Sequence, residues 1–343
     1  MSKILDQQLK AVVIHGPGLG EESEGFVALP LQQVPVGDIV PFDVFLKVRT
    51  NNQEARFVKA CIAGQAFEEE WYVKLNSLKI SWIYYQVGDE GRVLKYLVEQ
   101  TDKILLDEKR HNQEKINQLH DVSQIWLQHI FRSGVAPDSN QLRVAQHLTS
   151  SFYEYLKHDP APLHYLLDMR RHVYNLYTHT LGVLVLGMAF LAHLGWSSRD
   201  AQHFGVGVLV HDIGMTKIPQ EIINQKEPLT KDQRNQIKRH PLEGFRLLKD
   251  QPHLRKEALL MVMQHHENCD GSGYPSGLKE PHIHPWAQIL RILDSYEALT
   301  AARPWRGPET PSEALWTMSK DCQKKQIYKK QYLKAFIKFL AAQ

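Results

Sequence analysis

The sequence predicts a small α+β module followed by a larger all-α helical domain, and two patterns support this division. Between roughly residues 9 and 88, short β-branched or aromatic runs alternate with Gly, Pro and Asn, as in strands joined by turns. From Asn140 to the C-terminus, apolar residues recur almost throughout at helical spacing. At 343 residues the chain is long enough for about two units that each bury a core.

The N-terminal module is expected to contain five short strands and two amphipathic helices. The helices are predicted over EEEWYVKLNSL and GRVLKYLVEQTDKILLD, because the apolar residues of each repeat with a helical period. The expected strands are LKAVVIH, FVALPLQQV, FDVFLKV, RFVKACIA and SWIYYQV. We assign this module to residues 1–105 and expect a sensory or regulatory role for it.

A charged stretch after this module is predicted to be a connecting helix, in which apolar residues such as Ile116 and Trp126 recur near helical spacing. Ser133-Gly134 and Pro137-Asp138 then interrupt the chain before the helical domain begins. The predicted boundaries are therefore 106–135 for the connecting helix and 136–343 for the all-α domain.

Composition excludes several classes of protein. Lys and Arg outnumber Asp and Glu by only 41 to 38, so no global basic field predicts binding to a nucleic acid polymer or to a membrane surface. Cys61, Cys269 and Cys322 are odd in number and widely spaced, which indicates free thiols in the reducing cytoplasm. The longest apolar stretch, Leu181 to Leu194, is too short for a membrane span and is expected to be a buried helix.

Histidines and acidic residues in the helical domain predict a metal site. His211 and Asp212 are adjacent at the end of an apolar helix, and His179 shares its helical face with apolar residues. His240 follows a polar helix. Each position alone has an alternative: an incidental histidine beside a helix-terminal Asp, a hydrogen-bonded core histidine, or a cation that the helix macrodipole favours.

The pair His265-His266 and the carboxylate Asp294 strengthen this prediction. Successive side chains on a helix diverge by about 100°, so the two imidazoles can serve two metal ions, or one metal ion and the substrate. Asp294 shares its face with Ala and Leu residues, where a carboxylate is costly unless it is paired or bound to a metal. Mixed imidazole and carboxylate ligands suit Fe, Mn, Zn or Ni.

The segments HDIG, HHE, DGSGYPSGL and DSYEALTAARPWR resemble the motifs of the HD-GYP subgroup of the HD phosphohydrolases, over about residues 165 to 318. This resemblance implies an all-helical domain with a two- or three-metal site and phosphodiesterase activity on cyclic di-GMP or a related cyclic dinucleotide. It also implies that Asp212 bridges the metals. The implied metal ligands are His179, His211, Asp212, His240, His265, His266 and Asp294.

The resemblance also implies residues that contact the substrate. Arg303 and Arg306 are expected to bind phosphate oxygens, because a guanidinium group contacts phosphate bidentately; the alternative is surface charge after a helix end. Gly273 and Tyr274 lie in a turn that could present the tyrosine ring to the substrate or to a partner protein. An equally weighted alternative is that Tyr274 only anchors this turn.

Two positions depart from the family pattern. Met215 replaces the lysine of HDIGK, and we assign a catalytic role beside Asp212 to Lys217, two residues further along. Asn175 replaces a glutamate of three-metal members, so two divalent ions are expected, Fe or Mn before Ni or Zn. Glu280 and Glu297 replace a usual glycine and a common aspartate, which changes the surroundings of the site without removing a ligand.

The leading hypothesis is a cytoplasmic phosphodiesterase of bacterial second-messenger signalling that converts cyclic di-GMP, or a related cyclic dinucleotide, to linear dinucleotide, to GMP, or to both. The alternative is a degenerate domain that acts as a cyclic-dinucleotide receptor or as a protein-interaction module, which Met215 favours. A different HD hydrolase is disfavoured by DGSGYP. Further partners considered are signalling proteins bound through the GYP segment and a second copy of the chain as a homodimer.

Overall fold

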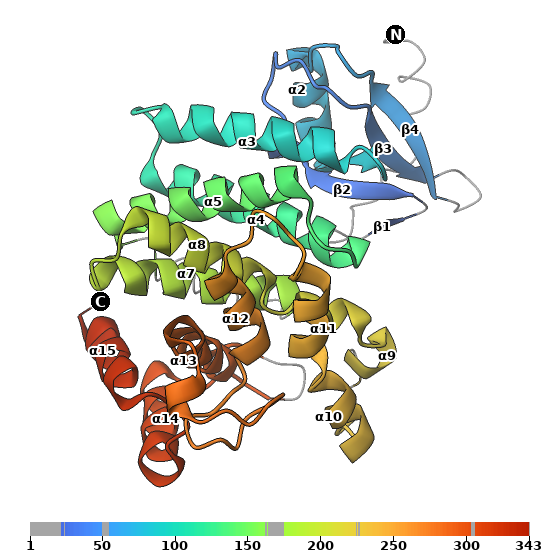
Figure 1. The fold of residues 1–343 in the computed structure, drawn as a ribbon. Coiled ribbons are helices and arrows are strands. Elements are labelled where there is room, and N and C mark those ends of the chain that lie inside the picture. The colour runs from blue at the N-terminus through green and yellow to red at the C-terminus, as the bar shows by residue number, and fades with distance from the viewer. Residues whose placement is uncertain are drawn as a thin grey trace. The chain divides into compact units, whose positions relative to one another are not determined.

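The computed structural model describes residues 22–23, 25–49, 55–161, 163, 175–223, 225, 227–302 and 306–342 (Figure 1). The chain divides into two compact units, residues 1–107 and 108–343. An antiparallel sheet with helices forms the first unit, and the described part of the second is helical, which confirms the predicted fold class. The expected strand LKAVVIH and Arg303 lie outside the described residues.

The sheet of the first unit has the strand order β1-β2-β5-β3-β4 in its described part, and all its pairings are antiparallel. Its strands are β1 (Glu22–Ser23), β2 (Phe26–Pro30), β3 (Val44–Arg49), β4 (Ala55–Cys61) and β5 (Trp82–Gln86). Helices α2 (Glu69–Ser77) and α3 (Glu90–Leu106) accompany the sheet, close to the predicted ranges. The strand predicted over FVALPLQQV ends at Pro30 and continues as the 3-10 helix η1 (Leu31–Gln33). Proline has no N–H to donate to a ladder, which suits the end of a strand.

Helix α4 (Asn112–Ser133) occupies most of the segment predicted to connect the two domains. It belongs to the second compact unit, where it packs against α5 (Ser139–His158) and α7 (Leu176–His193). Trp126 is fully buried and donates from its indole Nε1 to the backbone carbonyl of Gln141, 3.0 Å away. The apolar face of α4 therefore forms part of the helical core.

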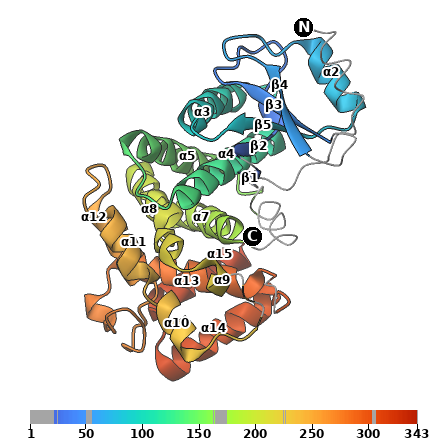
Figure 2. The same cartoon turned by 90° about the vertical axis from the view of Figure 1, so that its right-hand side faces the viewer.

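Helix α7 lies at the centre of the second unit, among α4, α5, α8 (Ser198–Val210), α13 (Pro285–Thr300) and α15 (Lys330–Ala341) (Figure 2). Its 18 residues have the length and apolar composition of a membrane span, but 72% of this stretch is buried within the protein. It therefore serves as the core helix of a helical unit. The expected buried helix over Leu181 to Leu194 is thus present, extended at its N-terminal end.

The remaining helices carry or support the cluster described below. They are η2 (Ile213–Lys217), α9 (Gln220–Ile223), α10 (Lys231–Ile237), α11 (His240–Leu248), α12 (Lys256–Gln264), η3 (Glu280–His282) and α14 (Pro311–Lys325). Helix α11 packs closely on η2 and on α12, and α12 packs on α8 and α13. The ends of several helices therefore meet at one place in this unit.

Candidate metal centre

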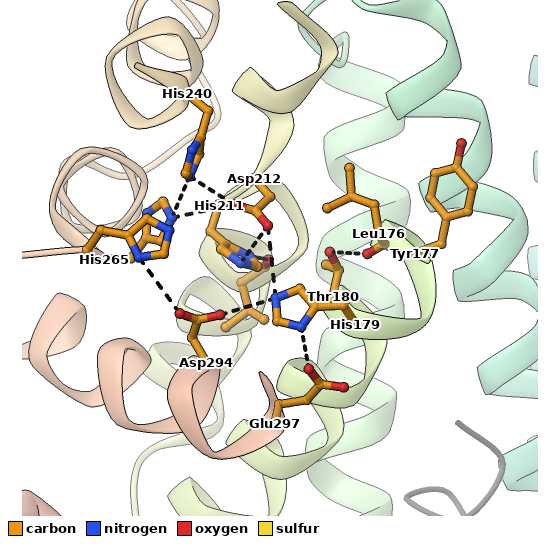
Figure 3. Close-up of polar contacts among 12 residues, drawn as sticks. Leu176, Tyr177, His179, Thr180, His211, Asp212, His240, His265, Asp294 and Glu297 are labelled. Carbon is orange, nitrogen blue, oxygen red and sulfur yellow. Dashed lines mark hydrogen bonds and ion pairs between the residues drawn. The ribbon is translucent and has the colours of Figure 1, made fainter. Parts of the chain in front are cut away.

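The seven side chains predicted as metal ligands lie together in the helical unit (Figure 3). They come from five places in the chain: α7, the end of α8, the start of α11, the end of α12, and α13. They form two groups, and within each group one donor atom per residue lies within 4.8 Å of the others. We call them the outer group, which contains Asp212, His240, His265 and His266, and the inner group, which contains His179, His211 and Asp294.

Asp212 faces both groups with different oxygens. Its Oδ1 lies 3.1 Å from His240 Nε2 and 3.4 Å from His265 Nε2, in the outer group. Its Oδ2 lies 3.4 Å from His211 Nε2 and 3.9 Å from His179 Nε2, in the inner group. A carboxylate with one oxygen toward each group has the arrangement that a bridging ligand needs.

Asp294, on α13, also directs its two oxygens toward different groups. Its Oδ1 lies 3.2 Å from His179 Nε2, and its Oδ2 lies 3.9 Å from His266 Nδ1. Figure 3 shows this carboxylate between the two groups. The sequence indicated a buried carboxylate here but no link between groups.

Three of the histidines are oriented by the backbone just before them, because Nδ1 of each lies within hydrogen-bond distance of the carbonyl three residues earlier. The pairs are His211 with Val208 at 2.7 Å, His240 with Ile237 at 2.8 Å, and His265 with Val262 at 2.9 Å. A ring that donates from Nδ1 keeps a lone pair on Nε2 for a metal. His211 Nε2 is buried and has no hydrogen-bond partner among the described residues, which fits a metal ligand.

Charge and burial shift the pKa values of four members of the cluster in the direction that metal binding needs. Burial lowers the pKa of His211 to about 4, and burial together with His265 and His240 holds the pKa of His266 well below its usual value. Burial alone would raise the pKa of Asp212 and Asp294, but the neighbouring histidines outweigh it and lower both. Neutral imidazoles and ionised carboxylates are the forms that bind divalent ions.

Glu297 is a functional residue that the sequence analysis missed, since it was treated only as a change in the surroundings. Its side chain is 1% exposed and accepts a hydrogen bond from Nδ1 of His179 (Figure 3). A carboxylate behind a metal-binding histidine fixes the ring and increases its basicity. The sequence feature that could have identified Glu297 was its position, one helical turn after Asp294 on α13.

Two glycines of the motifs allow backbones to approach closely. A Cβ on Gly214 would lie 1.9 Å from the carbonyl oxygen of His240, so η2 can pack against the start of α11 only with glycine there. A Cβ on Gly273 would lie 2.3 Å from the backbone nitrogen of Asn268. Gly273 was predicted to contact substrate; its visible effect is to let the GYP turn pack against the chain after His266.

Tyr274 is turned toward the outer group. Its ring stacks on His266, with centroids 4.7 Å apart and planes at 28°. The turn is held by Glu267, a buried carboxylate that accepts from the backbone nitrogens of Ser276 at 2.7 Å and Leu278 at 2.9 Å. Burial raises the pKa of the Tyr274 hydroxyl, so the ring stays neutral. The turn is thus anchored and also presents its ring to the cluster.

Two of the predicted cations, Lys217 and Arg306, are engaged by other partners in the part of the chain that the structure describes. Lys217 donates from Nζ to the carbonyl of Gly134, 2.9 Å away at the end of α4. Arg306 donates to Glu309 and to the carbonyl of Ala298, both at 2.7 Å, and so closes the end of α13. In this conformation neither cation donates to a residue of the cluster.

Asn175, the residue on which the predicted count of two metal ions rests, is a helix cap. Asn175 is the N-cap of α7, and its Oδ1 accepts from the backbone nitrogens of Tyr177 at 3.0 Å and Thr178 at 2.9 Å. Such a cap stabilises a helix by about 1 kcal/mol. The amide oxygen of Asn175 is therefore already engaged by the backbone.

Comparisons with known proteins agree with this site. Residues 164–327 match the HD domain family. The chain is 32% identical over 143 residues to "Cyclic di-GMP phosphodiesterase PA4108" of Pseudomonas aeruginosa, covering 42% of this chain and 34% of the relative. It is 36% identical over 139 residues to "3'3'-cGAMP-specific phosphodiesterase 1" of Vibrio cholerae, covering 40% of this chain and 32% of the relative. The chain thus spans about a third of the length of these curated relatives.

One solved structure shares the fold over most of the chain. This is Bd1817, described as an HDG"Y"P protein from Bdellovibrio bacteriovorus, with a TM-score of 0.66 and 17% identity. The similarity covers 92% of this chain and 99% of that one. The family match thus places an HD domain in the helical part of this chain, and the motifs there resemble those of the HD-GYP subgroup.

Proposed function

We propose that this chain is a metal-dependent phosphodiesterase that hydrolyses cyclic di-GMP, or a related cyclic dinucleotide, to linear dinucleotide or GMP. The observation that carries the proposal is the pair of aspartates, since Asp212 and Asp294 each direct one oxygen to the inner group and one to the outer group. This donor set suits two divalent transition-metal ions, iron or manganese first and nickel or zinc as alternatives. The printed names of the relatives support the substrate class.

The chain's own residues would prepare the site for a phosphodiester. When bound, two close metal ions would lower the pKa of a shared water and neutralise charge on the phosphate. The backbone carbonyls of Val208 and Ile237 and the carboxylate of Glu297 hold the imidazoles in place, so little reorganisation is needed at reaction. His266 is 21% exposed, whereas His211 and His265 are fully buried, so substrate would approach past His266 and Tyr274.

A centre of two ions, not three, is part of this proposal. The amide oxygen of Asn175 accepts two backbone hydrogen bonds as the cap of α7 and carries no charge for a third ion. Elemental analysis after anaerobic purification is expected to give two ions per chain. A value of three would refute this count.

Product analysis tests the proposed activity. Metal-reconstituted protein is incubated with cyclic di-GMP and, separately, with the mixed GMP-AMP cyclic dinucleotide, and the products are separated by chromatography. We expect linear dinucleotide or GMP from at least one substrate, and none from the Asp212→Ala variant. Intact substrates after incubation with fully metal-loaded native protein would contradict the proposal.

Met215 favours a second candidate, a receptor that binds the dinucleotide without turning it over. A thioether cannot donate a hydrogen bond to phosphate, so this position lacks the charged donor that related motifs carry. The receptor hypothesis predicts tight, metal-dependent binding of cyclic di-GMP with no product. Equilibrium dialysis followed by chromatography of the bound nucleotide separates the two functions.

The N-terminal unit and the partners complete the proposal. We propose that residues 1–105 regulate the helical domain, joined through the helix predicted over 106–135, and that the protein acts in the cytoplasm. Three unpaired cysteines, Cys61, Cys269 and Cys322, support a reducing compartment. A signalling protein bound at the GYP turn and a second copy of the chain are the partners to test, by pull-down and by sedimentation.

A further inference from the structure

We infer that Arg291 binds the substrate phosphate and supplies the positive charge that Met215 lacks. This inference rests on the proposed function, because it concerns the substrate of that same site. Arg291 lies on α13, three residues before Asp294, and its Nη1 is 3.9 Å from Asp294 Oδ2. Among the described residues it is the one Arg or Lys that forms an ion pair with either aspartate of the cluster.

The guanidinium group of Arg291 is held in place from two sides. Its Nε donates to Asn268 Oδ1 at 3.1 Å, and its Nη1 donates to Ser295 Oγ at 2.6 Å. The ring of Tyr328 lies against the guanidinium carbon, with its centroid 5.7 Å away. A cation fixed in this way loses little conformational entropy when it binds an anion.

One end of this guanidinium remains available. Nη2 of Arg291 has no hydrogen-bond partner among the described residues, whereas Nε and Nη1 are engaged. The side chain is 21% exposed, as is that of His266, whereas the Asp294 side chain is 10% exposed. Arg291 therefore lies on the edge of the cluster that solvent reaches, which is where a phosphate would arrive.

Three other candidate cations among the described residues are less suitable. Lys217 is bound to the carbonyl of Gly134 and Arg306 to the end of α13, as described above. Lys238 lies over the outer part of the GYP turn, with Nζ 5.4 Å from the centre of the Tyr274 ring, and forms no ion pair with either aspartate. Arg291 is the cation that lies beside Asp294, and a guanidinium is a strong donor to non-bridging phosphate oxygens.

Phosphate binding by variants tests this role. Inorganic phosphate is titrated calorimetrically into Mn²⁺-loaded native protein, Arg291→Gln, Arg291→Lys and the matched control Arg199→Gln. Arg199 is exposed in the first turn of α8, at the opposite end of that helix from His211. We expect the phosphate Kd to rise about tenfold or more in Arg291→Gln, with an intermediate rise in Arg291→Lys, because one charge-assisted hydrogen bond is lost. The Arg199→Gln variant should bind phosphate like the native protein.

A purely structural role of Arg291 predicts different results. In that case Arg291→Gln would lower the melting temperature and leave the phosphate Kd unchanged, and Asn268→Ala would reproduce its effects. We expect instead that Asn268→Ala largely keeps phosphate affinity and that the Mn²⁺ content of all variants stays native. An unchanged Kd in both Arg291 variants, with native Mn²⁺ content, would overturn the inference.

Turnover separates this inference from the proposed function. With cyclic di-GMP as substrate, Arg291→Gln should raise KM more than it lowers kcat, since phosphate contact contributes to binding before reaction. Arg291-dependent phosphate binding without hydrolysis by the native protein would refute the enzyme and leave the binding role intact. Hydrolysis by the native protein with a KM that does not depend on Arg291 would support the enzyme and refute the phosphate-binding role of Arg291.

Discussion

The inner and outer donor groups differ in what supports their histidines. In the inner group, His179 is backed by the buried carboxylate of Glu297, and all three members are buried. In the outer group, Nδ1 of His240 and of His265 lies against a backbone carbonyl three residues earlier, and His266 is partly exposed beside the Tyr274 ring. Under the proposed function, the inner group would hold its metal more rigidly, whereas the outer group would face solvent and substrate.

Removing Asp212 is expected to have the largest effect, because the oxygens of this carboxylate face both groups. The Asp212→Ala variant should lose both ions and all measurable hydrolysis, since each group loses a carboxylate oxygen directed toward it. Elemental analysis of the purified variant measures the metal content, and chromatography of the products measures hydrolysis. Native metal stoichiometry in this variant would show that Asp212 does not bridge.

Gly214→Ala should damage the outer group before the inner one. The added Cβ would meet the carbonyl of His240 at 1.9 Å, so η2 and the start of α11 must move apart. We expect a loss of about 1–3 kcal/mol in unfolding free energy, as for other overpacked sites, and about one metal ion per chain instead of two. Gly91→Ala is the matched control, since a Cβ there meets nothing within 4 Å. Two ions retained with native stability would indicate that the packing adapts.

Much of the site was predictable because its ligands stand in recognisable surroundings. Asp294 was found as a carboxylate on an apolar helical face, and the histidines were found through their motifs. Glu297 was not, because nothing local reveals that a buried glutamate meets a histidine 118 residues away. The same limit applies to Arg291, whose orientation depends on Asn268 in another segment. Spacing along a helix predicts which residues share a face. Which residue of another segment contacts that face is determined by the tertiary fold.

The direction of the Lys217 side chain, at the end of the short 3-10 helix η2, could also not be predicted from the sequence. Lys217 was assigned a catalytic role because it lies two residues after Met215, the position of the family's lysine, and its ammonium group donates to the Gly134 carbonyl in this structure. The N-terminal sheet shows a related limit, since Pro30 ends β2 where an apolar run suggested that the strand continued. Both cases concern where an element ends, which local composition specifies weakly.

Glu297→Gln tests whether the inner group depends on its carboxylate support. The amide cannot stabilise the donated proton of His179 as a carboxylate does, so metal affinity of the inner group should fall about 10–100-fold. The outer group should keep its affinity, which gives two separated steps in a Mn²⁺ titration. Glu69→Gln, an exposed change in the N-terminal unit, serves as the control. Equal weakening of both steps would remove the distinction between the groups.

Acid should destabilise the metal-free protein through the inner group. The pKa of His211 is about 4 in the folded state and about 6.5 when exposed, so between these values the unfolded chain binds a proton that the folded chain does not. Stability should therefore fall as pH decreases from about 6.5 toward 4, by about 2 kcal/mol at pH 5 from His211 alone. Urea unfolding of chelator-treated protein measures this, and His211→Asn should reduce the slope. An unchanged slope in that variant would assign the effect to other groups.

The smallest effects are expected at the position where the chain departs from the family pattern. Met215→Lys would place an ammonium group on η2, directly after the Asp212-Ile213-Gly214 turn that joins the two groups. A preorganised charge near a phosphate can contribute on the order of a hundredfold in rate, but Arg291 already supplies one cation, so we expect a gain of about tenfold at most.

Lys217→Ala should leave turnover unchanged, because the Lys217 ammonium is 2.9 Å from the Gly134 carbonyl and not within the cluster. Initial rates with cyclic di-GMP at saturating Mn²⁺ measure both variants. A large loss of turnover in Lys217→Ala would mean that η2 rearranges when substrate binds and carries Lys217 inward, which would assign the outer group a second cation.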